Sequence, residues 1–221
     1  MGEQKYGIDS NKVIAIAEDI INVFNKKKQL CIVVGGGNIF RGISGAAQGI
    51  DRATADGMGM LATVINAMAL QNAIESKGVS TRVLSAVPMQ TICEPFIRRR
   101  ALRHLNKNRI IILAAGTGNP YFSTDTAATL RAAEMNCDII FKGTSVDGVY
   151  DSDPKENPNS KRYSSVSYKK VLSDNLQVMD SSAISLARDN AIPMVVFSIL
   201  KKNSFSKVID ATGSYTIISE D

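Results

Sequence analysis

The 221-residue chain has no tryptophan, one histidine and three cysteines, and each shortage excludes a class of protein. A single histidine, His104, leaves no poly-histidine metal site and one residue at most for a histidine-based triad. Because it lies among arginines, with no serine or cysteine motif beside it, we expect a surface histidine on a basic helix. Cys31, Cys93 and Cys137 are an odd number at wide spacing. They fit neither a disulfide framework nor a C-x-x-C metal site, so we expect reduced thiols and no metal ligands from the protein.

Long hydrophobic runs are also scarce. Residues are 44% hydrophobic and 21% charged, as in an ordinary globular chain. The longest apolar runs, such as Arg109–Ala115, fall short of the ~18 residues that span a bilayer, and Met1–Tyr6 lacks the apolar run of a secretory signal. These features predict a cytoplasmic protein without a membrane partner. The net charge of +5 is modest and mixed, which favours anionic ligands such as nucleotide phosphates over nucleic acid.

Strand and helix patterns alternate along the chain. Apolar, β-branched runs predict strands at residues 30–34, 82–87, 109–115, 138–141, 194–197 and 215–219. Helical spacing predicts helices at residues 11–27, 53–77, 123–135 and 179–190. Strands separated by whole helices form parallel sheets covered by helices, so the fold class is α/β with a mainly parallel central sheet. We expect one domain over residues 1–221, with residues 151–163 as an ordered surface loop.

Glycine-bearing turns follow three of the predicted strands, at Gly35–Asn38, Gly116–Pro120 and Lys142–Thr144. Ligands of parallel sheets bind beyond the carboxyl ends of the strands, and glycines there let backbone N–H groups approach phosphate oxygens. One such turn is equally typical of a tight strand-to-helix connection. Three of them, with Arg41 four residues beyond Gly37, favour an anion site.

Two common nucleotide fingerprints fail. Gly37 and Gly42 have P-loop spacing, but Ile43 follows where a lysine is required, and Phe40 replaces the third glycine of a dinucleotide motif. Phosphoryl transfer needs alignment and cations more than a strong base. Lys142, expected directly after the strand 138–141, could reach a transferring phosphate; the alternative is a solvent-exposed lysine at a strand end.

Four longer strings resemble one family. They are Val33-Val34-Gly35-Gly36-Gly37-Asn38-Ile39-Phe40-Arg41-Gly42, Asp56-x-Met58-Gly59-Met60-Leu61-Ala62-Thr63, Ala115-Gly116-Thr117-Gly118-Asn119-Pro120-Tyr121-Phe122-Ser123-Thr124-Asp125, and Lys142-Gly143-Thr144-x-Val146-Asp147-Gly148-Val149-Tyr150-x-x-Asp153-Pro154. In this order they resemble the bacterial uridylate (UMP) kinases, a branch of the amino-acid kinase superfamily. The first string is shared loosely across the superfamily, whereas the third is more specific to the uridylate branch.

The resemblance implies a three-layer α/β/α sandwich, assembled as a homohexamer. It implies a kinase of pyrimidine nucleotide biosynthesis that converts ATP and UMP into ADP and UDP, with Mg²⁺ held mainly by the nucleotide phosphates. It also implies activation by GTP and inhibition by UTP in many members, although no residue here allows us to derive either effect.

Site residues follow from the same resemblance. The UMP set is Gly36, Asp56, Thr117, Gly118, Asn119, Pro120, Tyr121, Phe122, Ser123 and Thr124. The ATP set is Gly37, Arg41, Thr144, Tyr150 and Asp153, and the catalytic set is Lys142, Asp180 and Arg41. Asp56 can accept hydrogen bonds from ribose hydroxyls. Tyr150 is also compatible with a core position, Asp180 with capping a following helix, and Asp125 with opening one, since Ser123, Thr124 and Asp125 are all residues that favour helix N-caps.

The beginning of the sequence departs from the family pattern. Relatives begin with a strand that carries a K-x-S-G-E type segment, whereas Met1–Asp9 resembles the part that follows it. We therefore expect a first strand and a catalytic cation to be missing, through a misassigned start codon or trimming of the chain. The alternative function is a non-catalytic nucleotide-binding subunit or regulator. A carboxylate kinase of the same superfamily is disfavoured by the loop Gly116–Asp125.

Overall fold

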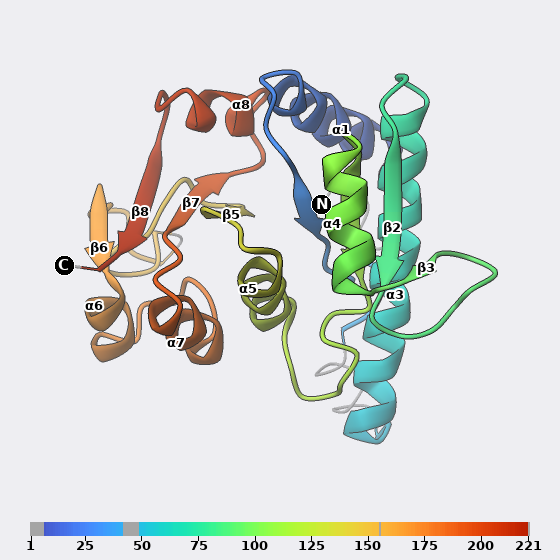
Figure 1. Cartoon of the computed structure of the whole chain (residues 1–221). Helices are drawn as coiled ribbons and strands as arrows, with labels where there is room; N and C mark the ends of the chain where they lie inside the picture. Colours follow the sequence, from blue (N-terminus) through green and yellow to red (C-terminus); the bar gives the residue numbers. More distant parts are fainter. Residues whose placement is uncertain (1–6, 42–48, 155, 221) are drawn as a thin grey trace. The chain divides into compact units, whose positions relative to one another are not determined.

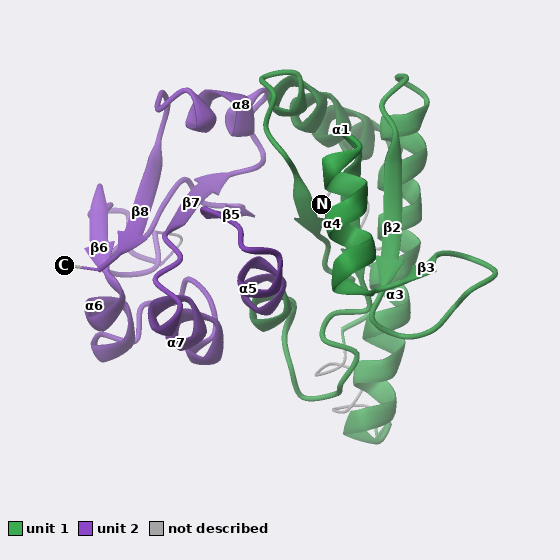
Figure 2. Ribbon diagram, viewed as in Figure 1, with its two compact units in different colours: residues 1–127 green, residues 128–221 purple. Residues whose placement is uncertain are grey.

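The computed structural model describes residues 7–41, 49–154 and 156–220 (Figure 1). Residues 1–6, which belong to the segment Met1–Asp9 discussed above, lie outside this part. The chain divides into two compact units, residues 1–127 and 128–221 (Figure 2). Each unit carries its own four-stranded sheet, so the strands predicted to form one central sheet belong to two sheets.

The first unit contains a four-stranded parallel sheet. Its strands are β1 (Cys31–Val33), β2 (Thr81–Ser85), β3 (Glu94–Pro95) and β4 (Ile110–Ala114), in the order β1-β4-β2-β3. All three strand pairs are parallel, as the alternating pattern predicted. Every residue of β4 is buried, because this strand has a neighbour on each side. The two-residue strand β3 is too short to leave a periodic signal in the sequence.

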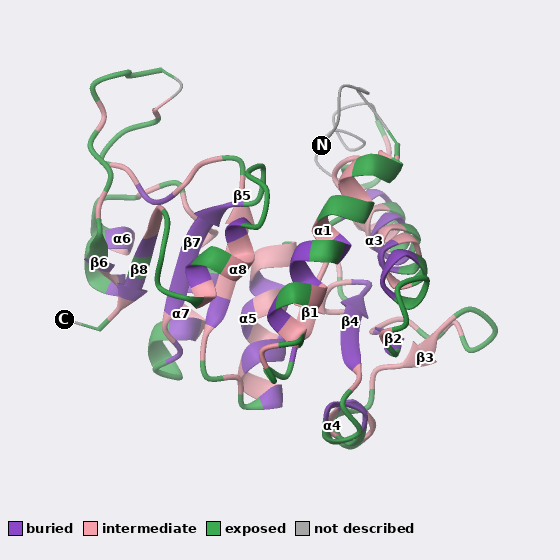
Figure 3. Ribbon diagram, turned by 90° about the horizontal axis from the view of Figure 1, so that it is seen from above, coloured by how far each residue is buried: buried purple, intermediate pink, exposed green. Residues whose placement is uncertain are grey.

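Helices cover both faces of this sheet. They are α1 (Ser10–Phe24), α3 (Arg52–Glu75) and α4 (Arg98–Asn106). Figure 3 shows α4 on one side of β2 and β4, with α1 and α3 on the other. Asp9 caps the N-terminus of α1, and Asp51 caps α3 by accepting a hydrogen bond from the Thr54 N–H. Both caps satisfy backbone N–H groups that have no partner within the helix.

The 24-residue helix α3 is long and apolar enough to cross a membrane by length and composition, although the apolar runs of the sequence predicted no such segment. Of its most apolar window, 33% is buried inside the structure. Ala67, Leu70 and Ile74 are among its buried residues, and the helix packs on β2 and β4. The apolar residues of α3 therefore serve in part as the core of the first unit.

The second unit also has four strands. They are β5 (Ile140–Thr144), β6 (Ser165–Ser167), β7 (Met194–Ser198) and β8 (Tyr215–Ser219), in the order β5-β7-β8-β6. Only the β7–β8 pair is antiparallel; β5–β7 and β6–β8 are parallel. The mainly parallel α/β architecture predicted from the sequence is thereby confirmed.

The other helices of the described residues are α5 (Thr124–Met135), α6 (Tyr168–Ser173), α7 (Ser181–Asp189) and α8 (Ser204–Ile209). The boundary between the two units falls within α5. The core of the second unit includes Ile184, Met194 and Ile218. Tyr168 is also buried there, its hydroxyl donates to the carbonyl of Ile192, and burial raises the pKa of Tyr168 to about 12.

Candidate active site

The helix α3 supplies the frame of the candidate UMP site. Asp56, Thr63 and Asn66 are separated by seven and three residues, so they lie on one face of the helix. This face meets both glycine-bearing loops of the first unit, the loop 35–38 after β1 and the loop 115–123 after β4. One helix thus fixes the backbone of two loops that are far apart in the sequence.

Asn66 holds the first loop. Its side-chain amide donates to the carbonyl of Gly35 at 2.7 Å and to Oδ1 of Asn38 at 2.6 Å, while the Asn38 amide donates back to Asn66 Oδ1 at 3.1 Å. Gly36 is buried against α3, and a Cβ atom there would lie 2.7 Å from the carbonyl oxygen of Gly59. Only glycine fits this approach of loop to helix.

Thr63 and Asp56 hold the second loop at two strained residues. Ala115 and Tyr121 adopt left-handed φ angles of 61° and 70°, which cost non-glycine residues on the order of 1–3 kcal/mol each. The Ala115 N–H donates to Thr63 Oγ1 at 2.7 Å, and the Tyr121 N–H donates to Asp56 Oδ2 at 2.8 Å. Strain of this kind is concentrated at functional sites because the surrounding structure must enforce it.

The remaining residues of the UMP set form an open rim. Thr117 Oγ1 accepts a hydrogen bond from the Asn119 N–H at 3.1 Å, which closes the turn. The side chains of Tyr121 and Phe122 are 67% and 57% exposed. Ser123 is the N-cap of α5 because its Oγ accepts from the N–H groups of residues 125 and 126, so Asp125 lies in the first turn and does not cap the helix.

Arg41 is exposed at the end of the first loop. Its Nε donates to the carbonyl oxygen of Gly37 at 3.2 Å. This contact folds the side chain back over the loop. The segment that follows, residues 42–48, is outside the described part of the chain and includes Gly42 of the failed P-loop spacing.

Lys142 occupies a different position from the predicted one. The sequence suggested a strand that ends at Phe141, but β5 runs from Ile140 to Thr144, and Lys142 pairs with Val196 of β7 in the middle of the strand. The ladder with β7 continues through the polar residues, because backbone pairing does not depend on their hydrophobicity. Lys142 is half-buried there, so the alternative of a solvent-exposed lysine at a strand end is wrong.

A cavity of about 370 Å³ lies in the second unit beside the predicted ATP residues. It is lined by Ser145, Val146, Asp147, Tyr150, Pro154, Ser198 and Lys201. The Tyr150 hydroxyl donates to Asp147 Oδ1 at 2.6 Å, and Lys201 Nζ lies 3.7 Å from Asp147 Oδ2. The hydrogen bond from Tyr150 lowers the pKa of Asp147, with a smaller contribution from Lys201, and it raises the pKa of Tyr150. Tyr150 is therefore a half-buried wall of a cavity and not a core residue.

Three further predicted residues lie in the second unit. Thr144 ends β5, and its carbonyl accepts from the Ile199 N–H at 2.9 Å. Asp153 is exposed in the segment between Val149 and Tyr163, and the Tyr163 N–H donates to the Val149 carbonyl at 2.8 Å. Asp180 is the N-cap of α7, accepting from the Ala183 N–H at 2.8 Å, so its capping role is confirmed.

His104 is buried, and our expectation of a surface histidine is wrong. Its side chain lies between two charged partners, with Nε2 3.1 Å from Glu94 Oε2 and Nδ1 3.1 Å from Nη1 of Arg109. A guanidinium can only donate, so Nδ1 accepts and Nε2–H donates to Glu94. The basic sequence around His104 concealed the pairing, because Glu94 lies ten residues earlier.

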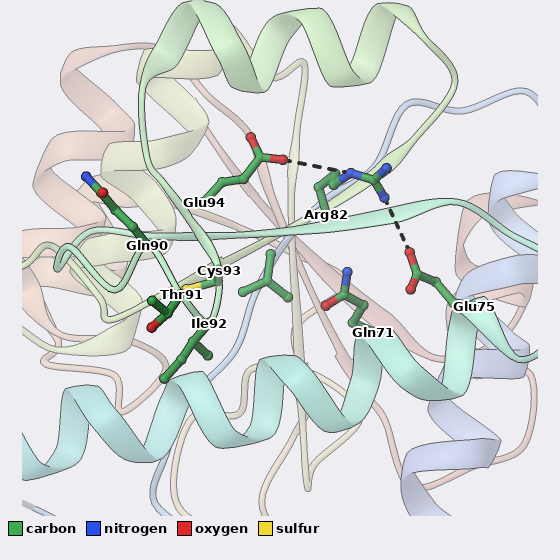
Figure 4. Close-up of a pocket in the computed structure, with 9 residues that line it drawn as sticks. Gln71, Glu75, Arg82, Gln90, Thr91, Ile92, Cys93 and Glu94 are labelled. Atoms are coloured by element: carbon green, nitrogen blue, oxygen red, sulfur yellow. Dashed lines mark hydrogen bonds and ion pairs between the residues drawn. The ribbon is translucent and has the colours of Figure 1, made fainter.

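Another cavity, of about 320 Å³, lies in the first unit, and none of the predicted site residues line it (Figure 4). Arg82 lies between two carboxylates on its wall, with Nη1 3.4 Å from Glu75 Oε1 and Nε 3.8 Å from Glu94 Oε1. Cys93 also lines it, and burial raises the pKa of its thiol. All three cysteines are half-buried thiols that are not joined in disulfides.

Carboxylate, histidine and cysteine side chains of the described residues do not gather into a group of three or more that could hold a metal ion.

Comparisons with known proteins identify the family of the chain. The profile of the Amino acid kinase family matches residues 6–198, so the chain belongs to the amino acid kinase family. More particularly, it is 60% identical to the uridylate kinase of Erythrobacter litoralis (strain HTCC2594) over 218 residues, which are 99% of this chain and 92% of that protein. It is 58% identical to the uridylate kinase of Zymomonas mobilis subsp. mobilis (strain ATCC 31821 / ZM4 / CP4), covering 100% of this chain and 91% of the relative.

Solved structures give the same result. The crystal structure of UMP kinase from Ureaplasma parvum matches with a TM-score of 0.95 and 41% identity, covering 100% of this chain and 94% of the other. The UMP kinase from Bacillus anthracis matches with a TM-score of 0.94 and 37% identity, covering 99% and 91%. The fold predicted from the family resemblance is therefore confirmed.

The sequence patterns did not identify the residues that hold the two loops and Asp56 of the candidate UMP site. Thr63 stands in the second family string without an assigned role, Asn66 falls only within the predicted helix 53–77, and Arg52, which donates to Asp56, carries no prediction. A signal was available, because positions 7 and 10 residues beyond Asp56 share its helical face.

Proposed function

We propose that this chain is a uridylate kinase that transfers the γ-phosphoryl group of ATP to UMP. A phosphate oxygen of UMP attacks the γ-phosphorus, the bond to the bridging oxygen of ADP breaks, and UDP and ADP leave. The observation that carries this proposal is the 60% identity to a uridylate kinase over 99% of the chain. This similarity favours an enzyme over a non-catalytic regulator.

UMP is assigned to the loops organised by α3. In this assignment the Asp56 carboxylate accepts hydrogen bonds from the ribose hydroxyls, and Gly36 lets the backbone N–H groups of the first loop approach the nucleotide. The exposed rim Thr117–Thr124 offers hydroxyl, amide and aromatic groups to uracil. Buried polar groups that match a substrate discriminate strongly against analogues that leave them unpaired.

ATP is assigned to the cavity beside Tyr150, together with Gly37, Arg41, Thr144 and Asp153. In this assignment Lys142 and Arg41 neutralise charge that develops on the transferring group, and Asp180 orients lysines at the centre while it caps α7. Bound Mg²⁺ would supply further charge neutralisation on the ATP phosphates.

Lys142 provides the direct test. We expect Lys142→Ala to lower kcat by about 10²–10³-fold, the usual effect of removing a group that stabilises transition-state charge, while UMP still binds. UDP formation and UMP affinity of the full chain are measured beside Lys169→Ala, an exposed lysine on α6. Normal turnover of Lys142→Ala would refute its role. Absence of UDP from the unaltered chain, despite UMP binding, would favour the non-catalytic alternative.

The family resemblance also supports a cytoplasmic homohexamer that is activated by GTP and inhibited by UTP. One feature of α3 favours self-association. Met58, Leu61, Ile65 and Met68 are 40–52% exposed and follow the 3-4-3 spacing of one helical stripe. Sedimentation of the chain, and its UDP formation with each nucleotide added, test these points. A monomer whose rate is unaffected by GTP and UTP would contradict them.

A further inference from the structure

We propose that Arg52 is a positioning residue that fixes the Asp56 carboxylate for recognition of the ribose, and that it thereby sets the preference for ribonucleotides over 2′-deoxyribonucleotides. This inference rests on the proposed UMP site at Asp56. It concerns substrate selection and not the transfer of the phosphoryl group.

Two donors meet at one oxygen of Asp56. The Arg52 Nε and the Tyr121 N–H each donate to Oδ2 at 2.8 Å. A carboxylate has two oxygens and about four acceptor positions. The hydrogen bonds to the Asp56 side chain that we find within residues 7–41, 49–154 and 156–220 both end on Oδ2, which leaves Oδ1 to accept from a ligand.

Asp56 is poorly exposed, with 15% of its side chain accessible, compared with 39% for Arg52. A carboxylate with restricted access to water is stabilised further when both of its oxygens accept hydrogen bonds. The protein supplies them to Oδ2, and a ribose with neighbouring 2′ and 3′ hydroxyls can supply them to Oδ1. A 2′-deoxyribose offers one donor fewer, so a fixed Oδ1 discriminates between the two sugars.

Arg52 also restrains the loop. Its guanidinium carbon lies 5.5 Å from the centroid of the Tyr121 ring, so the same cation contacts both the side chain of Tyr121 and the carboxylate that accepts the Tyr121 N–H. Tyr121 needs such restraint because its φ angle of 70° is unfavourable. Arg52, Asp56 and Tyr121 form a closed triangle, whereas an ordinary i,i+4 ion pair on a helix fixes neither partner.

The second unit offers a matched control. Lys170 and Asp174 are also spaced i,i+4, their Nζ and Oδ2 atoms are 2.6 Å apart, and Lys170 Nζ lies 5.7 Å from the ring centroid of Tyr163. Lys170, Asp174 and Tyr163 thus combine a cation, a carboxylate and a tyrosine as Arg52, Asp56 and Tyr121 do. The Lys170–Asp174 pair, however, is solvent-exposed and belongs to no assigned site. Lys170→Ala therefore measures the effect of losing such a pair on general stability.

The experiment compares Arg52→Ala, Arg52→Lys and Lys170→Ala with the unaltered chain, using UMP and 2′-deoxy-UMP. We expect Arg52→Ala to raise the KM and Kd for UMP about tenfold, with kcat changed less than about twofold, because orientation of the carboxylate affects binding and not transfer. The UMP/deoxy-UMP affinity ratio should fall toward one. Arg52→Lys should be intermediate, because lysine lacks the planar fork and the Nε–H. Lys170→Ala should leave all of these values unchanged.

An unchanged sugar preference in a folded Arg52→Ala variant, confirmed by its thermal melting temperature, would overturn the proposal. If Arg52→Ala does not fold, the same result from Arg52→Lys would overturn it. Asp56→Ala distinguishes a failure of the role of Arg52 from a failure of the proposed UMP site. If Asp56→Ala loses UMP affinity while the Arg52 variants do not, the inference fails and the site stands; if Asp56→Ala binds UMP normally, the proposed site itself fails.

Discussion

At the residue scale, single side chains hold the two candidate binding regions through a small number of short hydrogen bonds. Asp56 and Thr63 each hold a residue with an unfavourable backbone angle, and Tyr150 pairs with Asp147 beside a cavity. Because each of these groups is at least partly removed from water, the loss of one partner leaves the other unsatisfied. Substitutions at these positions should therefore have measurable effects on stability.

The pairing of Tyr150 with Asp147 predicts a pH-dependent contribution to stability. The folded pKa of Asp147 lies below its ordinary value of 3.8, chiefly because of the Tyr150 hydrogen bond. A lowered folded pKa means that the contribution is complete above pH 3.8 and is lost as the pH falls through the folded pKa. We expect Tyr150→Phe to cost about 1 kcal/mol near pH 7, with the difference shrinking in acid. Urea unfolding across this range measures it; a difference that is independent of pH would contradict the expectation.

Thr63 gives a prediction about a buried hydrogen bond. Its hydroxyl accepts from the Ala115 N–H and donates to the Met60 carbonyl, both at 2.7 Å. Thr63→Val preserves the shape but leaves this N–H without its partner, so we expect a loss of about 2 kcal/mol in the free energy of unfolding. Thr63→Ser keeps the hydroxyl and should be considerably less harmful. Equal stability of the valine and serine variants in urea would show that the bond contributes nothing.

At the scale of elements, α3 organises the first unit by contacting β2, β4 and both glycine-bearing loops. The sequence predicted this helix within two residues of its observed ends, because its apolar pattern is long. It did not predict β3 or β6, which have two and three residues and are formed by pairing with distant strands. Periodicity identifies elements that carry their own signal, and it misses those that exist only through partners.

Two glycines near α3 provide a matched test of its contact with the first loop. Gly36→Ala would place a Cβ 2.7 Å from the Gly59 carbonyl oxygen, so we expect a loss of about 1–3 kcal/mol and weaker UMP binding. A Cβ on Gly57, in the helix itself, would meet nothing within 4 Å. Gly57→Ala should instead stabilise the helix by about 0.5–1 kcal/mol. Thermal or urea unfolding distinguishes the two, and a Gly36→Ala variant as stable as the unaltered chain would disprove the close approach.

At the scale of the whole molecule, the family resemblance predicted more than the residue patterns did. The glycine turns indicated an anion site, but the assignment to UMP and ATP depended on the order of four strings along the chain. The position of Lys142 within β5 and the burial of His104 could not be read from neighbouring residues. Each depends on contacts with residues distant in the sequence, Val196 and Glu94 respectively.

The division of the chain is likewise a property of the whole molecule. The residues assigned to UMP all lie within residues 1–127, whereas Lys142, Tyr150 and Asp153 belong to residues 128–221. The expectation of a single domain over residues 1–221 stays a prediction.

A crystal structure of the chain with UMP would show whether α3 and its two loops bind this nucleotide. We expect ribose hydroxyl oxygens at hydrogen-bond distance, about 2.5–3.2 Å, from Asp56 and a uracil ring against the segment Thr117–Thr124. Asp56 should keep its contacts with Arg52 and the Tyr121 N–H. UMP bound elsewhere, away from Asp56 and Asn119, would refute the assignment of this site.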